Sequence, residues 1–310
     1  MDSTGLAAVF LLHGLNSGGE KEWGNMVSYL EATNDFITGG IIQGGTGFQN
    51  KKLFDSEDIV KIEKAIGVDF DKIKDTELLK PFIQAKVAEL DEQGIDVLFM
   101  LDFTNNQGDF RNQGAELKKA IDLVNPKGHK ANVLAHSMGS LGTASYISGI
   151  SGVDYENDIN TFIAIGAPFK GSSWAFAADL AGDFLPGDLR RHGTAYHNLR
   201  PDSKAINQLQ KAWNNKSHNV NFHSLQCTAG DLVVSWNSST SLKGGKNHGL
   251  TFTIHTRQTK NLDYQKATYQ LLRNGTIEYN YTLKDLTWWE RFRLNHLGPA
   301  YETMLWRLTR

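Results

Sequence analysis

The stretch NVLAHSMGSLG, residues 132 to 142, places Ser137 between an apolar, strand-like run and a segment rich in small residues. Ala135 and Gly139 stand two positions before and two positions after this serine. A nucleophilic serine at a sharp strand-to-helix turn needs small residues at those positions, because larger side chains collide across the turn. The spacing predicts that Ser137 is a nucleophile. The alternative is that Ser137 is only a hydroxyl in an ordinary tight turn. A base and an acid elsewhere in the sequence would distinguish a nucleophile from such a turn residue.

A serine hydroxyl attacks a carbonyl efficiently only when a histidine takes its proton and a carboxylate orients that histidine. Asp231 follows the strand-like segment NFHSLQCTAG, at the sheet edge where α/β proteins gather functional side chains, and is the expected acid. A turn aspartate that caps its own backbone is the alternative. Two histidines compete as the base. His255 ends the apolar run LTFTIH and should project from the end of the last strand, whereas His248 precedes that run and needs a different strand boundary.

Acyl transfer also needs donors for the negative charge that develops on the carbonyl oxygen. The segment FLLHGLNSGG reads as a strand followed by a glycine-bordered loop, in which the N–H of Leu15, rather than that of Asn16, is expected to face the site. The second expected donor is the N–H of Met138, directly after the nucleophile. Both roles belong to the main chain, so replacing these side chains should change the shape of the site more than its donors.

Apolar runs alternate with helical patterns along the chain. Runs without in-and-out alternation are typical of strands covered on both faces, and the order strand, helix, strand is typical of α/β proteins. We therefore predict a mostly parallel, doubly wound sheet with helices on both faces. The predicted strands are AAVFLL, IDVLFML, ANVLA, TFIAIG, FHSLQC and LTFTIH, and the predicted helices are PFIQAKVAELDEQG, QGAELKKAIDLVNPKG, SLGTASYISGI and DYQKATYQLLRNG.

Two segments interrupt this alternation. Residues 43–75 are polar and contain glycines, which indicates an insertion near the strand ends that could shape the rim of the site. Residues 171–215 carry large apolar side chains at roughly helical spacing, including Trp174 and Phe176. We expect a helical lid over an apolar pocket in this second segment. An ordinary helix packed on the core is the alternative.

Bulk composition narrows the class of protein. With 310 residues and 40% hydrophobic content, the chain can bury a large core as one domain with insertions. A formal net charge of -2 offers no basic field, so no nucleic-acid partner is expected. The chain has one cysteine and neither zinc-type nor EF-hand spacing, so we expect no metal and no cofactor. It shows no membrane-spanning apolar run and no signal-peptide pattern, and both a cytoplasmic protein and a secreted chain without its leader fit.

The ordered motifs resemble the α/β-hydrolase superfamily, and within it the bacterial lipase and esterase branch. Besides the HG loop and the AHSMG turn, the stretches IAIGAPFKGSS, NLRPDSKAINQL and GDLVVSWNSS are similar to that branch. The resemblance covers roughly residues 6 to 273 and implies an α/β-hydrolase fold with a Ser-Asp-His triad that cleaves carboxylic esters through an acyl-enzyme. It also implies that His13, Phe169, Trp174 and Phe176 contact the substrate. Ala135 in place of the usual glycine, and Ser235 in place of a common proline, depart from the pattern.

This resemblance sets the expected domain division. Residues 1–276 form the hydrolase domain, with the insertion and the lid, and residues 277–310 form an extension packed on the body; a membrane-surface helix is the alternative for the extension. The expected substrate is a hydrophobic ester, either a small molecule, a lipid or a polyester. An amide, a thioester, a phospholipid or lipid-anchor ester, and a non-catalytic binding protein on the same scaffold are the alternatives.

Overall fold

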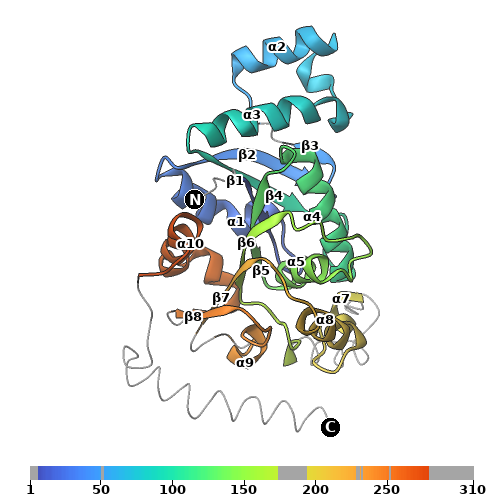
Figure 1. Cartoon of the computed structure of the whole chain (residues 1–310), viewed down its shortest axis with the longest axis vertical. Helices are drawn as coiled ribbons and strands as arrows, with labels where there is room; N and C mark the ends of the chain where they lie inside the picture. The colour runs from blue at the N-terminus through green and yellow to red at the C-terminus, as the bar shows by residue number, and fades with distance from the viewer. Residues whose placement is uncertain are drawn as a thin grey trace, which may run out of the picture.

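The fold is built on one eight-stranded sheet with the order β3-β2-β4-β1-β5-β6-β7-β8 (Figure 1). The computed structural model describes residues 6–49, 52–173, 194–227, 231, 233–250 and 253–278. All neighbouring strands pair in parallel except β2 and β3, which are antiparallel. The strands are β1 (Leu6–Leu12), β2 (Phe36–Gln43), β3 (Gly47–Gln49), β4 (Asp96–Asp102), β5 (Lys130–His136), β6 (Ile159–Ile165), β7 (Asn221–Cys227) and β8 (Lys246–Leu250).

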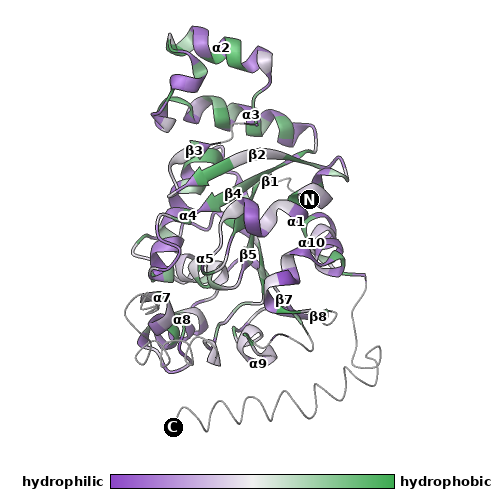
Figure 2. Ribbon diagram, turned by 180° about the vertical axis from the view of Figure 1, so that it is seen from behind, coloured by the Kyte–Doolittle hydropathy of each residue, from purple (hydrophilic) through white to green (hydrophobic). Residues whose placement is uncertain are grey.

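Helices cover both faces of this sheet. Helices α1 and α10 pack on one face, and α3, α4, α5 and α8 pack on the other (Figures 1 and 2). The helices are α1 (Gly19–Glu31), α2 (Ser56–Ile66), α3 (Lys80–Glu92), α4 (Phe110–Val124), α5 (Met138–Ser148), α7 (Thr194–Asn198), α8 (Lys204–Asn214), α9 (Trp236–Ser239) and α10 (Leu262–Asn274), with 3-10 turns η1 (Phe70–Lys72), η2 (Thr76–Leu78) and η4 (His255–Lys260). The predicted mostly parallel, doubly wound α/β fold is confirmed.

Strand β1, at the centre of the sheet, is apolar throughout because both of its faces are buried. In β1, Phe10 and Leu12 face the core beneath α4 and α5, while Val9 and Leu11 face the core beneath α1 and α10. All four side chains are fully buried. Burying an aliphatic or aromatic side chain of this size contributes about 1.5–3 kcal/mol. Two such cores, one on each face, fix the strand ends that carry the site.

Two elements that the sequence analysis did not predict lie early in the chain, α1 and β2. The strand β2 contains adjacent glycines, which weaken its apolar pattern. A methyl group on Gly39 would lie 2.4 Å from the ring of Phe99 on the neighbouring β4, so this glycine makes room for the ring. The glycine that weakens the strand pattern in the sequence is therefore required for packing in the fold.

The last strand also differs from its prediction. Pairing with β7 runs from Lys246 to Leu250, so β8 holds the sequence KNHGL rather than LTFTIH. As an edge strand β8 is only partly covered, and only Leu250 is buried in it. A half-covered edge tolerates polar residues, which is why an apolar run did not mark it. Consequently His248 lies inside the strand, and His255 begins the 3-10 turn η4.

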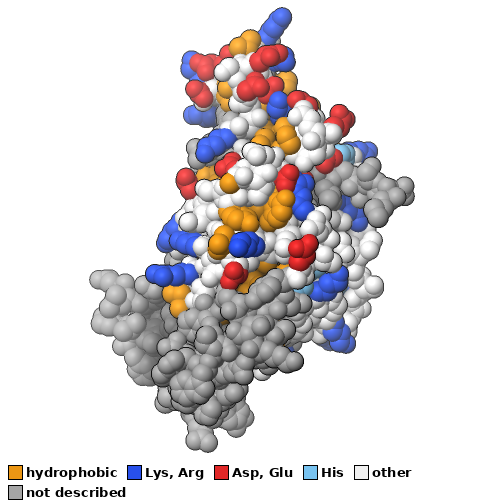
Figure 3. Space-filling view, turned by 90° about the vertical axis from the view of Figure 1, so that its left-hand side faces the viewer, with side chains coloured by type: hydrophobic (Ala, Val, Ile, Leu, Met, Phe, Trp, Pro, Cys, Tyr) orange, Lys and Arg blue, Asp and Glu red, His pale blue; other side chains and the backbone are white. Residues whose placement is uncertain are grey.

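The insertion at residues 43–75 lies at the opposite edge of the sheet from β8. It supplies β3, which pairs with β2, and then α2 and η1, with α2 at the end of the molecule beyond α3 (Figure 1). Charged side chains of both signs crowd this end of the molecule (Figure 3). The insertion therefore extends the β3 edge, several strands away from Ser137 at the end of β5.

The segment expected to form a lid is only partly described. Residues 174–193, and with them Trp174 and Phe176, lie outside the described residues. The following helix α8 packs on α5, with Ile206, Leu209 and Trp213 buried in the core. This part of the segment fits the alternative of an ordinary body helix. Most of the expected extension, residues 279–310, also lies outside the description, and no helix among the described residues is long and apolar enough to cross a membrane.

Close packing between α4 and α5 gives a stability prediction. A methyl group on Gly114 would lie 2.5 Å from Ser145 Oγ and 2.6 Å from the carbonyl oxygen of Gly142, whereas one on Gly24 in α1 would meet no atom within 4 Å. Gly114→Ala is expected to lower the free energy of unfolding by about 1–3 kcal/mol, because the two helices must move apart. The control Gly24→Ala should raise it by about 0.5–1 kcal/mol. Denaturant unfolding measures both, and equal effects of the two variants would contradict the packing argument.

Candidate active site

Ser137 occupies the turn between β5 and α5 with φ 52° and ψ −122°, a backbone conformation rare for any residue with a side chain. Its N–H donates a 2.9 Å hydrogen bond to the carbonyl of Ile165 in β6, which helps to hold the turn. A methyl group on Gly139 would lie 2.7 Å from the carbonyl oxygen of His13, so only glycine fits there. Strain of this kind costs about 1–3 kcal/mol and recurs at functional turns. The serine side chain is thereby presented at the carboxyl edge of the sheet.

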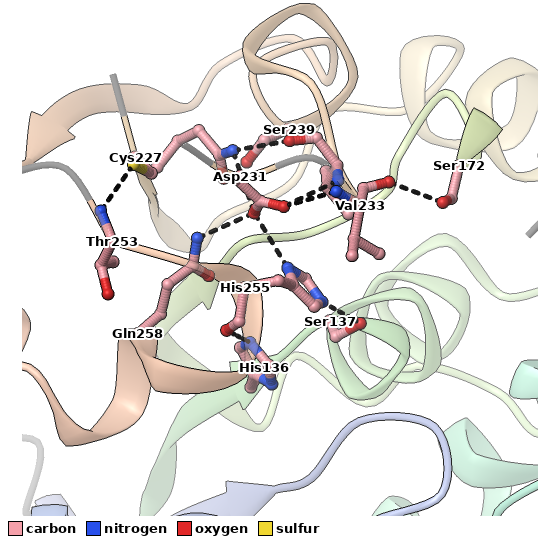
Figure 4. A network of polar contacts seen from close by, with 12 residues as sticks. His136, Ser137, Ser172, Cys227, Asp231, Val233, Ser239, Thr253, His255 and Gln258 are labelled. Carbon is pink, nitrogen blue, oxygen red and sulfur yellow. Dashed lines mark hydrogen bonds and ion pairs between the residues drawn. The ribbon is translucent and has the colours of Figure 1, made fainter. Parts of the chain in front are cut away.

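Three of the sequence-predicted residues come together at this edge (Figure 4). The Nε2 atom of His255 lies 2.9 Å from Ser137 Oγ, and its Nδ1 atom lies 2.9 Å from Asp231 Oδ2. Ser137 follows β5, Asp231 follows β7, and His255 opens η4 after β8. Their contacts form an unbroken chain from carboxylate to hydroxyl.

Asp231 is held by main-chain and side-chain donors. Its Oδ1 accepts 2.9 Å hydrogen bonds from the N–H groups of Val233 and Val234, and its Oδ2 accepts one of 2.8 Å from Gln258 (Figure 4). Burial alone raises the pKa of this carboxyl, but His255 and the hydrogen bonds outweigh it and lower the pKa below its ordinary value. The aspartate thus caps its own turn and faces the histidine at the same time. An ionised Asp231 favours the tautomer with hydrogen on Nδ1, which leaves Nε2 free to accept the serine proton.

The loop after β1 lies directly against the serine. A methyl group on Gly14 would lie 2.9 Å from the Cβ of Ser137. Met138 is the first residue of α5, where an N–H has no acceptor inside the helix, and the N–H of Leu15 donates to no described residue. The two expected donors therefore stand on the two segments that flank Ser137, with N–H groups that these segments leave unused.

His13 lies beneath this loop and is buried. Its Nδ1 atom lies 2.8 Å from the carbonyl oxygen of Gly14, and its ring packs on Phe103 with centroids 4.9 Å apart. Burial lowers the pKa of His13 although nearby acids oppose that change. These contacts support the loop from inside the protein, whereas the sequence analysis expected His13 to contact the substrate.

Two other predicted residues pack against side chains outside the contacts of Ser137, His255 and Asp231. The ring of Phe169 is fully buried and packs on Phe222 with centroids 5.8 Å apart, so it belongs to the core rather than to an open substrate surface. His248 Nε2 lies 3.1 Å from Nδ1 of His223, and the two rings stack. The structure thus brings His255, and not His248, to the serine.

Several residues of this region gave no sequence signal. Gln258 lies one turn beyond His255 in η4 and reaches back to Asp231, and Gln226 approaches the same oxygen at 3.4 Å. Glu22 of α1 forms an ion pair with His136, the residue before the serine. Long polar side chains at these positions look like surface residues in the sequence. These residues come close to the site only when α1 and η4 pack against the sheet, so their separation from Ser137 in the sequence does not indicate a role.

The described residues contain no group of three or more metal-binding side chains.

The fold and the order of these motifs define an α/β hydrolase. Residues 106–291, more than half of the chain, match the family model described as lecithin:cholesterol acyltransferase. The chain belongs to that family. A comparison with curated protein sequences found no match.

This chain is similar to several solved structures at low sequence identity. The product of gene lin2722 from Listeria innocua is 14% identical, with a TM-score of 0.53 over 89% of this chain and 97% of its own. The lipase BlEst2 from Bacillus licheniformis in its propeptide form is 15% identical, with a TM-score of 0.48 over 90% of this chain and 52% of its own. The phospholipase PlaB from Legionella pneumophila is 11% identical, with a TM-score of 0.45 over 76% of this chain and 45% of its own. This chain matches about half the length of the last two proteins.

Proposed function

We propose that this protein is a serine hydrolase that cleaves carboxylic esters of hydrophobic acids through an acyl-enzyme. The observation that carries the proposal is the chain of two 2.9 Å contacts from Asp231 through His255 to Ser137. Membership in a family named for acyl transfer supports the same chemistry. A strained serine, a buried histidine and an ionised aspartate in contact are more than a stable core requires.

The reaction begins when His255 Nε2 removes the proton of Ser137 as its oxygen attacks the ester carbonyl. The negative charge moves to the carbonyl oxygen, where the N–H groups of Leu15 and Met138 stabilise it. The intermediate then expels the alkoxide, which takes the proton from His255, and the acyl group stays on the serine. Water attacks this ester in the same way and releases the acid. Asp231 stabilises the imidazolium in both halves and stays ionised.

The surroundings of the acid and the base support a hydrophobic substrate. Trp236, shortly after the acid, is 38% exposed, and Ile254, directly before the base, is 48% exposed. Exposed large apolar side chains this close in sequence to the acid and the base favour an apolar acyl chain over a charged substrate. A phospholipid ester, or an alcohol in place of water as the acceptor, requires no other catalytic group. These remain alternatives that a substrate panel separates.

A fluorophosphonate probe is expected to label the protein at Ser137, because such a probe reacts with an activated serine. Mass spectrometry of the labelled peptide locates the adduct. Hydrolysis rates are then measured for p-nitrophenyl esters of increasing chain length, for an amide and for a phospholipid in vesicles. We expect the long-chain ester to react fastest and the amide to react slowly. Absence of labelling together with binding to vesicles would replace the proposal by a non-catalytic binding function.

A further inference from the structure

A second carboxylate and imidazole lie directly below the proposed triad. Oε1 of Glu22, in α1, lies 2.8 Å from Nδ1 of His136, at the end of β5. The other ring nitrogen of His136 lies 3.2 Å from the carbonyl oxygen of His255 (Figure 4). Both side chains are largely buried, with 4% of His136 and 11% of Glu22 exposed. The second pair therefore contacts the backbone of the residue that serves as the proposed base.

The contacts of His136 determine its protonation. One ring nitrogen faces a carboxylate and the other faces a carbonyl, and both of these groups only accept hydrogen bonds. A neutral imidazole would leave one nitrogen lone pair against an acceptor oxygen inside the protein. This arrangement favours an imidazolium with hydrogen on both nitrogens.

The electrostatics of the pair agree with this geometry. Burial alone raises the pKa of Glu22, but His136 and the hydrogen bond from Ser17 outweigh it and hold that pKa at about 2. Burial alone lowers the pKa of His136, and Glu22 raises it above its ordinary value. The other titratable groups that face His136 are His13, Asp231 and the ring of His255, whose centroid lies 4.7 Å away.

Glu22 also joins segments that the proposed reaction needs in fixed positions. It accepts a 2.7 Å hydrogen bond from Ser17, in the loop that carries Leu15. Its backbone carbonyl accepts a 3.0 Å hydrogen bond from Thr259, in the turn η4 that His255 begins. One carboxylate-bearing residue is thus tied to the donor loop, the serine turn and the base turn.

We propose that Glu22 and His136 are positioning residues, an ion pair that fixes the backbone of His255 and the donor loop around Ser137. This inference rests on the proposed hydrolase function. A buried ion pair adds little net stability compared with apolar packing, because both charges lose their hydration. The pair instead holds these segments in one arrangement, because each of its contacts joins it to a segment that carries a reacting group. Displacement of a reacting group by about 1 Å can cost about 100-fold in rate.

Glu22→Gln tests this role in the kinetics. The variant removes the charge that favours a doubly protonated His136. The amide NH2 of the glutamine can donate to a neutral His136, so the contact with the carbonyl of His255 becomes a neutral and weaker hydrogen bond. We expect kcat for a p-nitrophenyl ester to fall about 10-fold to 100-fold, with KM within about twofold, because the substrate surface is unchanged. Glu20→Gln on the exposed side of the same helix is the matched control and should keep the wild-type kcat. A Glu22→Gln variant with wild-type kcat would overturn the proposal.

The proton count gives a readout that does not depend on activity. In the wild-type protein labelled with 15N-histidine, the signals that disappear in His136→Gln should show two protonated ring nitrogens from about pH 6 to pH 8. In Glu22→Gln the same ring should show one. A neutral His136 in the wild-type spectrum would overturn the proposal, even where a variant fails to fold. Failure of the hydrolase function would appear separately, as absence of probe labelling at Ser137.

Discussion

Ser137→Ala is expected to lower kcat for a p-nitrophenyl ester by at least about 10,000-fold and to abolish labelling by a fluorophosphonate probe. The alanine has no atom that can bond to the acyl carbon, so only binding and the main-chain donors would remain to assist water. The histidine contact at 2.9 Å would be lost with the hydroxyl. A fall in kcat of less than about tenfold would show that another group attacks the ester.

A glycine variant at the same position separates chemistry from folding. Ser137 has φ 52°, and alanine keeps the Cβ that makes this conformation costly, whereas glycine does not. Ser137→Gly should therefore be as inactive as Ser137→Ala but unfold at a higher temperature, by a margin that corresponds to about 1–3 kcal/mol of relieved strain. Thermal unfolding of both variants measures this difference. Equal stability would mean that the turn is not strained.

The architecture could be predicted from the sequence because a strand buried on both faces of a parallel sheet appears in the sequence as a continuous apolar run. Apolar runs without alternation correspond to β1, β4, β5, β6 and β7, and each lies inside the sheet. Strands whose residue types are determined by something other than burial on both faces could not be found in this way. In β2, Gly39 leaves room for the ring of Phe99 on the neighbouring strand. Strand β8 is polar because it is a half-covered edge.

The site shows the same division. Ser137 directly follows β5 and Asp231 follows β7, and the ends of these two strands can be read from the sequence. His255 was identified although the last strand was predicted with the wrong bounds. Glu22 stands in the first turn of α1, where a glutamate is normally solvent-exposed, and its partner is brought to it by the folding of α1 against the sheet. Phe169 was expected to contact the substrate because it lies in a motif near the site. Its buried ring packs beside Phe222, a contact that the sequence does not indicate.

The two candidate bases differ in what removing each imidazole should do. His255→Ala is expected to lower kcat by at least about 10,000-fold, since no other described histidine contacts Ser137 and a serine without a base is a poor nucleophile. His248→Ala is the matched control and should keep kcat within about threefold, because His248 lies on the edge strand β8 and its imidazole contacts His223 of β7. Burial, then His248 and Lys246, hold the pKa of His223 at about 4. Removing His248 should raise that pKa in an NMR titration, while a large loss of activity in His248→Ala would overturn the assignment of His255 as the base.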